Sequence, residues 1–369
     1  MELTELIRQH IRENGPLSFR NFMETALYHP ELGYYMSGHD KIGAGGDFYT
    51  SCCLGPVFGA MIAKQLAEMW RLSGEPEFTV VEFGAGNGWL CHDILDYFRE
   101  YTSVYERLHY VIIEKSPFMR ESERTHLHEK VCWHNDLEAV GAFTGCVLSN
   151  ELLDNFAVHQ VVMQDELMEV FVDDQDGLVE VLRPASPQLK AYFSELNVEL
   201  PAGYRTEVNL EAVEWLDKIS RYLQKGYVLT IDYGYLSDEF YKSCRSRGTV
   251  LCYNRHEVNE QFYHHVGKQD ITAHVNFSAL CHWGHQHGMS CCGLTSQAEF
   301  LLALDFKDYL RKQPNANGDI VQLAIQEARL TRTLLIDMGS KFKVLVQQKG
   351  MPNAQLSGLR PLVQNARPT

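Results

Sequence analysis

The sequence predicts an α/β protein with a doubly wound, mostly parallel sheet. Residues 78–82 form a β-rich run that ends in a glycine-rich turn and continues into a helical pattern at 89–97. A second apolar run at 110–114 precedes a helical pattern at 116–128, and further short strand-like runs recur up to residue 149. Strands that alternate with helices are typical of parallel sheets, because each return to the sheet needs a crossover connection.

The residues before this alternation predict helices and one long irregular stretch. Apolar residues follow a helical spacing in 3–13, and the sequence Asn14-Gly15-Pro16 ends that helix. A short helix follows Ser18, and 54–72 is amphipathic. Between them, an aromatic and glycine-rich stretch reaches Ser51. It is long for a plain connection, which indicates a functional loop.

The alternation is interrupted after the fourth strand. Residues 158–182 alternate strand-like runs with polar turns, which predicts an antiparallel insertion. The helix and strand pattern resumes at 211–223 and 227–232, and 342–347 predicts a final edge strand. We therefore expect an N-terminal helical segment, a sheet-bearing core in two pieces, an inserted antiparallel subdomain and a loose tail, at residues 1–75, 76–157 with 205–350, 158–204 and 351–369.

Composition restricts the class of protein. The chain has 369 residues, of which 45% are hydrophobic and 22% charged, as in folded globular proteins. Its net charge of −15 disfavours nucleic acid as a partner. Ten cysteines include no Cys-x-x-Cys, and the adjacent pairs Cys52-Cys53 and Cys291-Cys292 suit neither zinc nor an easy disulfide. With no leader or membrane-spanning pattern visible, we expect a cytoplasmic protein. Monomer and homodimer are not distinguished.

The glycine turn predicts an adenosine-containing cofactor. Glu82 ends the strand, and Gly84, Gly86 and Gly88 follow at alternate positions before the helix. Glycines let the backbone approach a ligand, and the free N–H groups of a helix N-terminus face it. The dinucleotide fingerprint requires a glycine where Trp89 stands, so nicotinamide cofactors fit poorly. The tighter spacing favours S-adenosylmethionine, which has no pyrophosphate.

Two further acids support this interpretation. Glu114 ends the second strand, where a carboxylate can bind both ribose hydroxyls, and Asp136 follows the third strand, where it can accept a hydrogen bond from the adenine amino group. One such acid would be an ordinary polar residue at a strand end. Three acids in register with the glycine turn favour S-adenosylmethionine.

The residues at the end of the fourth strand indicate the chemical class of the methyl acceptor. Asn150 and Glu151 follow the strand, and Asp154 is three residues beyond Glu151, so both acids share one face of a helical turn. Paired carboxylates suit a guanidinium, whose planar fork binds carboxylates bidentately. An alternative role for Asp154 is the N-cap of a surface turn. These three residues are the candidate catalytic residues.

Other clusters are weaker candidates. Residues 232–235 end the fifth strand and can line an acceptor pocket, and 270–277 can present His274 and Asn276 to one side. His282, His285 and His287 lack a recognised ligand pattern, so no metal is predicted.

Taken together, these segments resemble the MidA family, whose mitochondrial members are complex I assembly methyltransferases. The resemblance rests on motifs spread from about residue 15 to 350, which are 46–51, 54–59, 82–88, 149–154, 230–235, 248–249 with Tyr253 and His256, and 270–277. It implies a class I (Rossmann-like) methyltransferase core with a seven-stranded sheet. It also implies that the loop carrying Asp47, Thr50 and Ser51 lies against S-adenosylmethionine.

The resemblance further implies a protein substrate, since the mitochondrial relatives are associated with dimethylation of an arginine on a complex I subunit. Two departures concern the acceptor side. Residues 155–158 read Asn-Phe-Ala-Val where relatives often carry an Ala-Leu-Pro-Val-like run, and Asn276 stands where several relatives have aspartate.

Three hypotheses follow. The first is a protein arginine methyltransferase, with a subunit homologous to one of respiratory complex I as a candidate substrate. The second is a methyltransferase of small-molecule amines on the same fold. The third is an assembly or binding factor that uses this fold for partner recognition. The acids expected to contact the cofactor favour catalysis.

Overall fold

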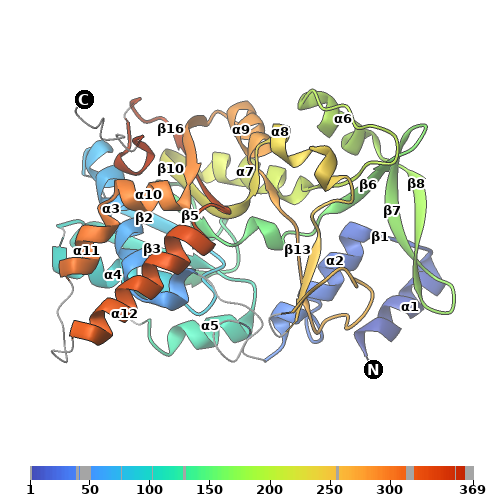
Figure 1. Ribbon diagram of the computed structural model, residues 1–369, viewed down its shortest axis with the longest axis horizontal. Coiled ribbons are helices and arrows are strands. Elements are labelled where there is room, and N and C mark those ends of the chain that lie inside the picture. The colour runs from blue at the N-terminus through green and yellow to red at the C-terminus, as the bar shows by residue number, and fades with distance from the viewer. Residues whose placement is uncertain are drawn as a thin grey trace.

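The computed structural model describes residues 2–38, 41, 51–75, 77–101, 103–127, 130–254, 257–312, 320–353 and 355–361. The chain folds into a large lobe built on the central sheet and a smaller lobe that contains the N-terminal helices (Figure 1). Within these residues, none of the helices has both the length and the apolar character to cross a membrane.

The central sheet confirms the predicted α/β fold. Five of its strands are joined by four parallel pairings. One further strand, residues 342–349, pairs antiparallel with this set. The spatial order is β15 (Ser290–Ser296), β16 (Phe342–Lys349), β10 (Leu223–Tyr235), β5 (Phe143–Asn150), β2 (Phe78–Phe83), β3 (Leu108–Ile113) and β4 (Val131–His134), and β14 (Val275–Asn276) pairs with the end of β10. The prediction that 342–347 forms an edge strand is wrong, because β16 lies between β10 and β15.

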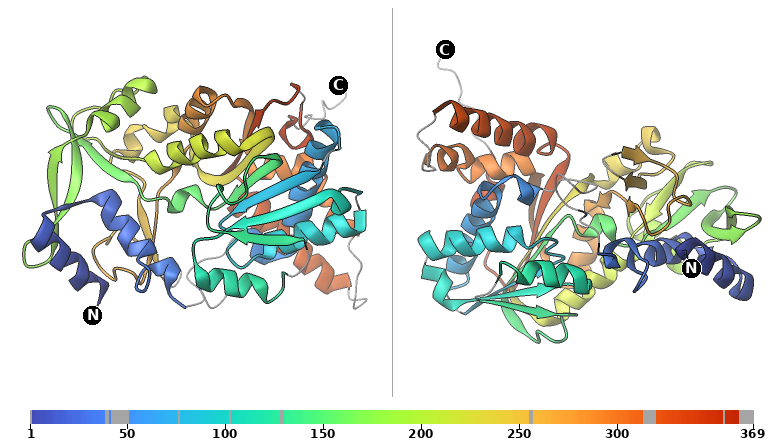
Figure 2. Two further views of the ribbon diagram at one scale, coloured as in Figure 1. Left: turned by 180° about the vertical axis from the view of Figure 1, so that it is seen from behind. Right: turned by 90° about the horizontal axis from the view of Figure 1, so that it is seen from below.

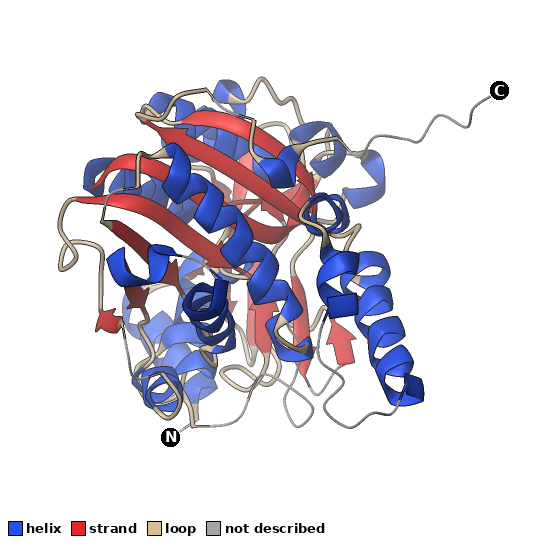
Figure 3. Cartoon of the chain, turned by 90° about the vertical axis from the view of Figure 1, so that its left-hand side faces the viewer, coloured by secondary structure: helices blue, strands red, loops and turns tan. Residues whose placement is uncertain are grey.

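Helices cover both faces of this sheet (Figures 2 and 3). Adjacent residues of β2 point to opposite faces, so Val80 packs in one hydrophobic cluster and Val81 in the other. The first cluster is covered by α3 (Val57–Leu72), α4 (Trp89–Tyr101), α10 (Gln297–Ala303), α11 (Phe306–Lys312) and α12 (Ile320–Thr331), and the second by α6 (Pro187–Glu195), α7 (Leu210–Tyr222) and α9 (Phe277–Gln286). Helix α5 (Pro117–Arg124) follows β3.

The smaller lobe is assembled from segments far apart in the sequence. Its antiparallel sheet runs β1 (Leu17–Ser18), β7 (Leu167–Asp174), β6 (His159–Met163) and β9 (Arg205–Val208), with β8 (Leu178–Pro184) paired to β7. Thus the sheet extends beyond the expected insertion at 158–204 to the N-terminal segment and to β9. Helices α1 (Leu3–Asn14) and α2 (Phe19–Tyr28) pack with it, as does a small sheet of β11 (Leu251–Asn254), β12 (Glu257–Asn259) and β13 (Asp270–Thr272).

Short turns complete the chain. They are the 3-10 turns η1 (Tyr34–Met36), η2 (Ser51–Leu54), η3 (Ser103–Arg107), η4 (Leu153–Asn155), η5 (Ser243–Arg245) and η7 (Ser357–Leu359), with helix α8 (Ser237–Phe240) and the π-helical turn η6 (Arg332–Asp337). The expected loose tail is in fact held at its start. The backbone N–H of Gly358 donates to Gln65 Oε1 (2.9 Å), and Ser357 Oγ donates to Glu68 Oε1 (2.8 Å), both on α3. Residues 362–369 lie outside the described chain.

Two glycines lie side by side near the first residues of the neighbouring strands β10 and β5, where the backbones approach closely. Gly226 of β10 pairs with Gly145 of β5, which pairs with Thr79 of β2. Gly226 has φ +143°, and a Cβ there would lie 1.9 Å from the carbonyl oxygen of Gly145. No side chain fits at this position without moving backbone in the middle of the sheet.

We predict that Gly226→Ala lowers the free energy of unfolding by about 3 kcal/mol or more, because backbone strain and a backbone clash act together. Gly177→Ala is the matched control. Gly177 has a similar φ of +156° but open space around its Cβ position, so its loss should stay near 1 kcal/mol. Urea unfolding followed by circular dichroism measures both. Equal losses would contradict the packing argument.

Candidate functional site

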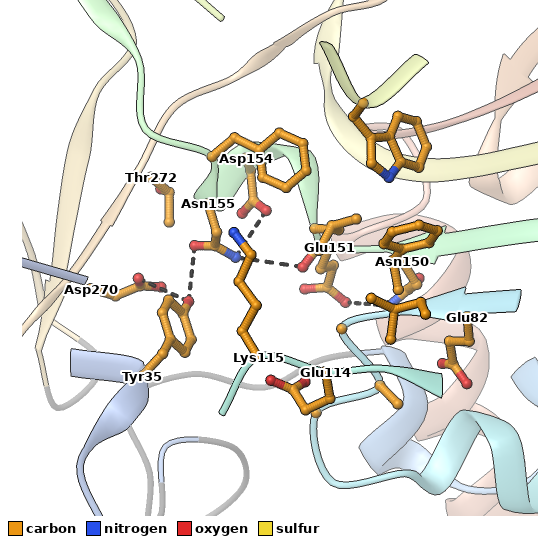
Figure 4. Close-up of a pocket in the computed structure, with 18 of the residues that line it drawn as sticks. Tyr35, Glu82, Glu114, Lys115, Asn150, Glu151, Asp154, Asn155, Asp270 and Thr272 are labelled. Carbon is orange, nitrogen blue, oxygen red and sulfur yellow. Dashed lines mark hydrogen bonds between the residues drawn. The ribbon is translucent and has the colours of Figure 1, made fainter. Parts of the chain in front are cut away.

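A pocket of about 970 Å³ lies between the two lobes, at the carboxyl ends of the parallel strands (Figure 4). The large lobe contributes the glycine turn after β2, the ends of β3 and β5, and the segment after β4. The smaller lobe contributes Tyr28, Tyr35, Asp270 and Thr272. Ligands of doubly wound sheets bind at this end of the strands, and the volume is typical of a small-molecule site.

The glycine turn adopts a backbone that other residues rarely adopt. Gly84, Gly86 and Gly88 have φ of +66°, +59° and +76°. A Cβ on Gly84 would lie 2.9 Å from Leu152 Cδ1, and one on Gly88 would lie 2.8 Å from Leu127 Cδ1. Gly84 and Gly86 line the pocket, so backbone rather than side chain forms this wall.

Two predicted acids lie buried at the ends of neighbouring strands. Glu82 Oε2 accepts a hydrogen bond from the hydroxyl of Tyr110 (2.8 Å), and burial raises the pKa of Glu82 to about 7. Glu114 Oε1 accepts from the backbone N–H of Ser116 (2.7 Å), and burial again raises its pKa. Both carboxyl groups line the pocket.

Asp136 and Trp89 also line the pocket. Asp136 Oδ1 accepts from the backbone N–H of Ala139 (3.0 Å), which fixes the carboxylate at the start of a turn. Trp89 is 43% exposed and stacks on His126 with ring centroids 4.5 Å apart. The residue that departs from the dinucleotide fingerprint therefore supplies an aromatic surface at the pocket.

The three candidate catalytic residues come together at the end of β5. Glu151 has φ +54°, a conformation rare for residues other than glycine and often found at functional sites. Its Oε1 accepts from the side-chain amide of Asn150 (3.2 Å) and the backbone N–H of Ser51 (3.4 Å). Asn150 Oδ1 is buried and has no hydrogen-bond partner among the described residues.

Glu151 and Asp154 share a buried environment. Burial, with a smaller effect from the charge of Asp154, raises the pKa of Glu151 to about 8. Burial also raises the pKa of Asp154 to about 7, although hydrogen bonds with Tyr233 and Asn155 act in the opposite direction. Asp154 lies inside the turn η4, whose N-cap is Leu152, and it lines the pocket. Both acids therefore hold protons readily at neutral pH, and a cation that approaches them favours their charged form.

Asp232 holds this turn in place. It is fully buried, and its Oδ2 accepts from three consecutive backbone N–H groups, those of Leu152 (3.2 Å), Leu153 (2.9 Å) and Asp154 (3.3 Å). Sequence reasoning considered residues 232–235 as pocket lining. The structure assigns that position to Tyr233, Gly234 and Tyr235, whereas Asp232 lies behind them and orients the loop.

The smaller lobe adds a polar group that the sequence did not single out. The hydroxyl of Tyr35 lies 2.9 Å from both Asn155 Oδ1 and Asp270 Oδ1, so it joins η1 to the loop after β5 and to β13 (Figure 4). Lys115 also lines the pocket and lies over the ring of Tyr28. The sequence signals for this wall are the aromatic stretch before residue 51 and the segment 270–277, neither of which singles out Tyr35.

Other candidates have mixed outcomes. Asp47 and Thr50 lie outside the described residues, whereas Ser51 is buried beside Glu151. His274 lines the pocket, and burial lowers its pKa to about 4. Asn276 instead caps α9, accepting from the backbone N–H of Ala279 (3.2 Å).

Two of the three histidines at the C-terminal end of α9 lie close to acids. His282 lies 3.0 Å from Glu195, and His287 lies 3.6 Å from Asp217. Across the described ranges, no group of three or more His, Cys, Asp and Glu side chains is placed to hold a metal ion.

Comparisons with known proteins identify the family of the chain and the cofactor of this site. A family model of S-adenosyl-L-methionine-dependent methyltransferases, Methyltransf_28, matches residues 61–295. A Burkholderia thailandensis protein crystallised with S-adenosyl-homocysteine is 31% identical, with a TM-score of 0.87 over 96% of this chain and 94% of that one.

Curated relatives extend the match. "Protein arginine methyltransferase NDUFAF7 homolog, mitochondrial" of Drosophila melanogaster is 27% identical over 96% of this chain and 86% of that protein. Its mouse counterpart is 27% identical over 96% of this chain and 79% of its own length. The chain therefore belongs to the MidA family of methyltransferases, and its cofactor is S-adenosyl-L-methionine.

Proposed function

We propose that this methyltransferase transfers a methyl group to a guanidinium nitrogen of an arginine side chain in a protein. The observation that carries the proposal is the pair of acids in the wall of the cofactor pocket, of which Asp154 is buried and Glu151 is half-buried. The curated relatives named above carry the name protein arginine methyltransferase. A subunit homologous to one of respiratory complex I is the first protein to test, and a cytoplasmic location stays a prediction, since those relatives are named mitochondrial.

The residues around the glycine turn fit S-adenosylmethionine. The turn leaves backbone alone at the wall, where a side chain on Gly86 would occupy ligand space. Glu114 would bind the ribose hydroxyls and Asp136 the adenine amino group, as their positions at the strand ends suggest. Asn150 Oδ1, buried without a partner among the described residues, can accept from the cofactor's ammonium group. When bound, the cofactor supplies an electrophilic methyl group on a positively charged sulfur.

Glu82, Gly84, Gly88 and Ser51 complete the proposed cofactor site, with Asp47 and Thr50 remaining predictions. Gly88 and Glu82 act through the shape of the turn. Gly88 starts the helix with φ +76°, and Glu82 holds the end of β2 through Tyr110. Ser51 brings η2 against Glu151, so the segment before α3 closes the pocket next to the acceptor acids.

Glu151 and Asp154 have two tasks in this mechanism. First, they orient the guanidinium, because two carboxylates can accept from both edges of its planar fork. Second, one of them takes the proton that the guanidinium nitrogen loses. A carboxyl group whose pKa is near 8 accepts a proton far more readily than an ordinary glutamate. Asn150 donates to Glu151 and holds this carboxylate toward the pocket.

The smaller lobe shields the reaction from water. Tyr28 and Tyr35 close the pocket opposite the sheet, with Tyr35 fixed to Asn155 and Asp270. A site that excludes water strengthens charge interactions and favours methyl transfer to the positioned nitrogen over transfer to solvent. Since this wall comes from outside the central sheet, it is where acceptor specificity can be encoded.

The cofactor assignment predicts that Glu114→Gln weakens S-adenosyl-homocysteine binding by about 10- to 100-fold, because one charged hydrogen-bond acceptor is lost. Gly86→Val should abolish binding. Titration calorimetry measures both. Glu121→Gln is the matched control, since Glu121 is exposed on the neighbouring α5 and does not line the pocket. Wild-type affinity in Glu114→Gln would remove Glu114 from the cofactor site.

The acceptor assignment predicts that Glu151→Gln keeps S-adenosyl-homocysteine affinity within about twofold but lowers methyl transfer by about 100-fold or more, the range for loss of a proton acceptor. Tritium from labelled cofactor is counted separately in the protein and small-molecule fractions of an extract. Glu214→Gln is the control, because Glu214 is an exposed acid of the same pocket. Retained transfer would exclude Glu151, and label confined to small molecules would favour an amine substrate.

The raised pKa values predict the pH dependence of transfer. Cation binding needs charged carboxylates, and Asp154 and Glu151 lose their protons near pH 7 and pH 8 in the free enzyme. The value of kcat/KM for the acceptor should therefore rise across the interval from about pH 6.5 to 8.5 and then level off. Initial rates in buffers of constant ionic strength measure it. A profile already flat above about pH 5.5, as for ordinary carboxylates, would show that neither acid titrates in the rate.

A further inference from the structure

Two cysteines outside the pocket lie next to each other. Cys281 is on α9 and Cys291 is on β15, and their sulfur atoms are 3.5 Å apart. Cys281 is half-buried and Cys291 is exposed. The sequence offers the adjacent Cys291-Cys292 pair, whose spacing does not suit an easy disulfide.

Strand register independently places Cys291 toward α9. Cys291 pairs with Gln347 of β16, so both side chains project from the same face of the sheet. The side-chain amide of Gln347 donates to the carbonyl oxygen of Leu280 on α9 (3.0 Å). Leu280 directly precedes Cys281 on α9. Because Cys291 projects from the same face of the sheet as Gln347, it lies beside Cys281.

A β-bulge separates Cys291 from its neighbour. The register shifts between Cys291 and Gly293, which leaves Cys292 unpaired in the ladder. Cys292 packs against the hydrophobic cluster on one face, whereas Cys281 packs against the cluster on the other. The two adjacent thiols therefore lie on different sides of the sheet, and Cys291 is the one that contacts Cys281.

The surroundings favour Cys291 as the reactive thiol. The S–H of Cys281 donates to the Cys291 sulfur, and together with a weaker contribution from the backbone N–H of Gly293 this lowers the Cys291 pKa to about 7, against the opposing effect of burial. The pKa of Cys281 is raised correspondingly, chiefly by the same hydrogen bond. An exposed thiol that ionises near neutral pH attacks disulfides readily.

We propose that Cys281 and Cys291 form a reversible disulfide, which makes them an oxidative modification site separate from the methyl-transfer pocket. The oxidant is a low-molecular-weight disulfide such as glutathione disulfide. The Cys291 thiolate attacks one of its sulfurs, forming a mixed disulfide and expelling one glutathione thiolate. Cys281 then loses its proton and attacks the Cys291 sulfur, which expels the second glutathione. The two protein thiols lose two electrons and two protons, and glutathione disulfide becomes two glutathione thiols.

The geometry requires only a small adjustment. A disulfide bond is about 2.05 Å long, so the sulfurs must approach by about 1.5 Å. Cys291 is on the edge strand of the sheet, and Cys281 is near the middle of α9. Rotation of the two side chains, with no change in the central strands, can supply this movement. The bond would join α9 directly to the sheet edge.

The test treats full-length protein with buffers of increasing ratio of glutathione disulfide to glutathione, blocks free thiols with N-ethylmaleimide, and maps peptides by mass spectrometry. The wild type should yield a cross-linked peptide pair joining Cys281 to Cys291. Cys281→Ser should instead accumulate glutathione on Cys291, because the resolving thiol is absent. Cys291→Ser should leave Cys281 largely unmodified.

Matched controls separate this site from general thiol oxidation. Cys292→Ser should keep the cross-link, since Cys292 faces the other cluster. Exposed Cys132 and Cys244 report background glutathionylation in the same digests. A cross-link between Cys291 and Cys292, or equal glutathionylation of Cys291 in the wild type and in Cys281→Ser, would overturn the proposal. None of these readouts depends on the methyl acceptor.

Discussion

The acceptor side of the pocket depends on one buried carboxylate. Asp232, at the end of β10, accepts hydrogen bonds from three backbone N–H groups in the loop that leaves β5. A charged acceptor for several amides is among the stronger interactions available inside a protein. It links two adjacent parallel strands and holds Glu151 at a positive φ that the residue would otherwise avoid. The position of Glu151 and Asp154 thus follows from a residue that is not among those lining the pocket.

The pocket has one side that is common to doubly wound proteins and a second side that comes from outside the central sheet. The central sheet supplies the glycine turn and the acids at the strand ends, as in other doubly wound proteins. The smaller lobe supplies Tyr28, Tyr35 and Asp270. Because Tyr35 is bonded to both Asn155 and Asp270, the two lobes meet at the loop that carries the candidate catalytic residues.

The sequence predicts the cofactor half of the site better than the acceptor half. The strand, glycine turn and helix from 78 to 101 are contiguous, so their pattern alone indicates their arrangement. Contacts across the lobes leave no such local pattern, since Tyr35 and Asp270 are 235 positions apart. Asp232 was visible as a strand-end acid, but the backbone donors that it binds are not encoded in its own segment.

The sheet shows the same limit. The apolar pattern of β16 identifies a strand but not its neighbours, so its place beside β15 could not be derived. Strand β15 itself contains Ser290, two cysteines and Gly293, and it lies at the exposed edge of the sheet, where few large apolar residues are needed. Its composition therefore gives little strand signal.

The smaller lobe is assembled from segments far apart in the sequence, and this affects how the chain can fold during its synthesis. Its hydrophobic cluster joins Leu3 and Phe19 to Val172, Val250 and Ile271. During synthesis, α1 and α2 leave the ribosome long before all the segments that cover them, and their apolar faces stay partly uncovered until residues near 272 emerge. Strand β16, which lies between β10 and β15 in the central sheet, emerges later still. Neither lobe is therefore complete before most of the chain has been made, and an unfinished chain cannot enclose the pocket.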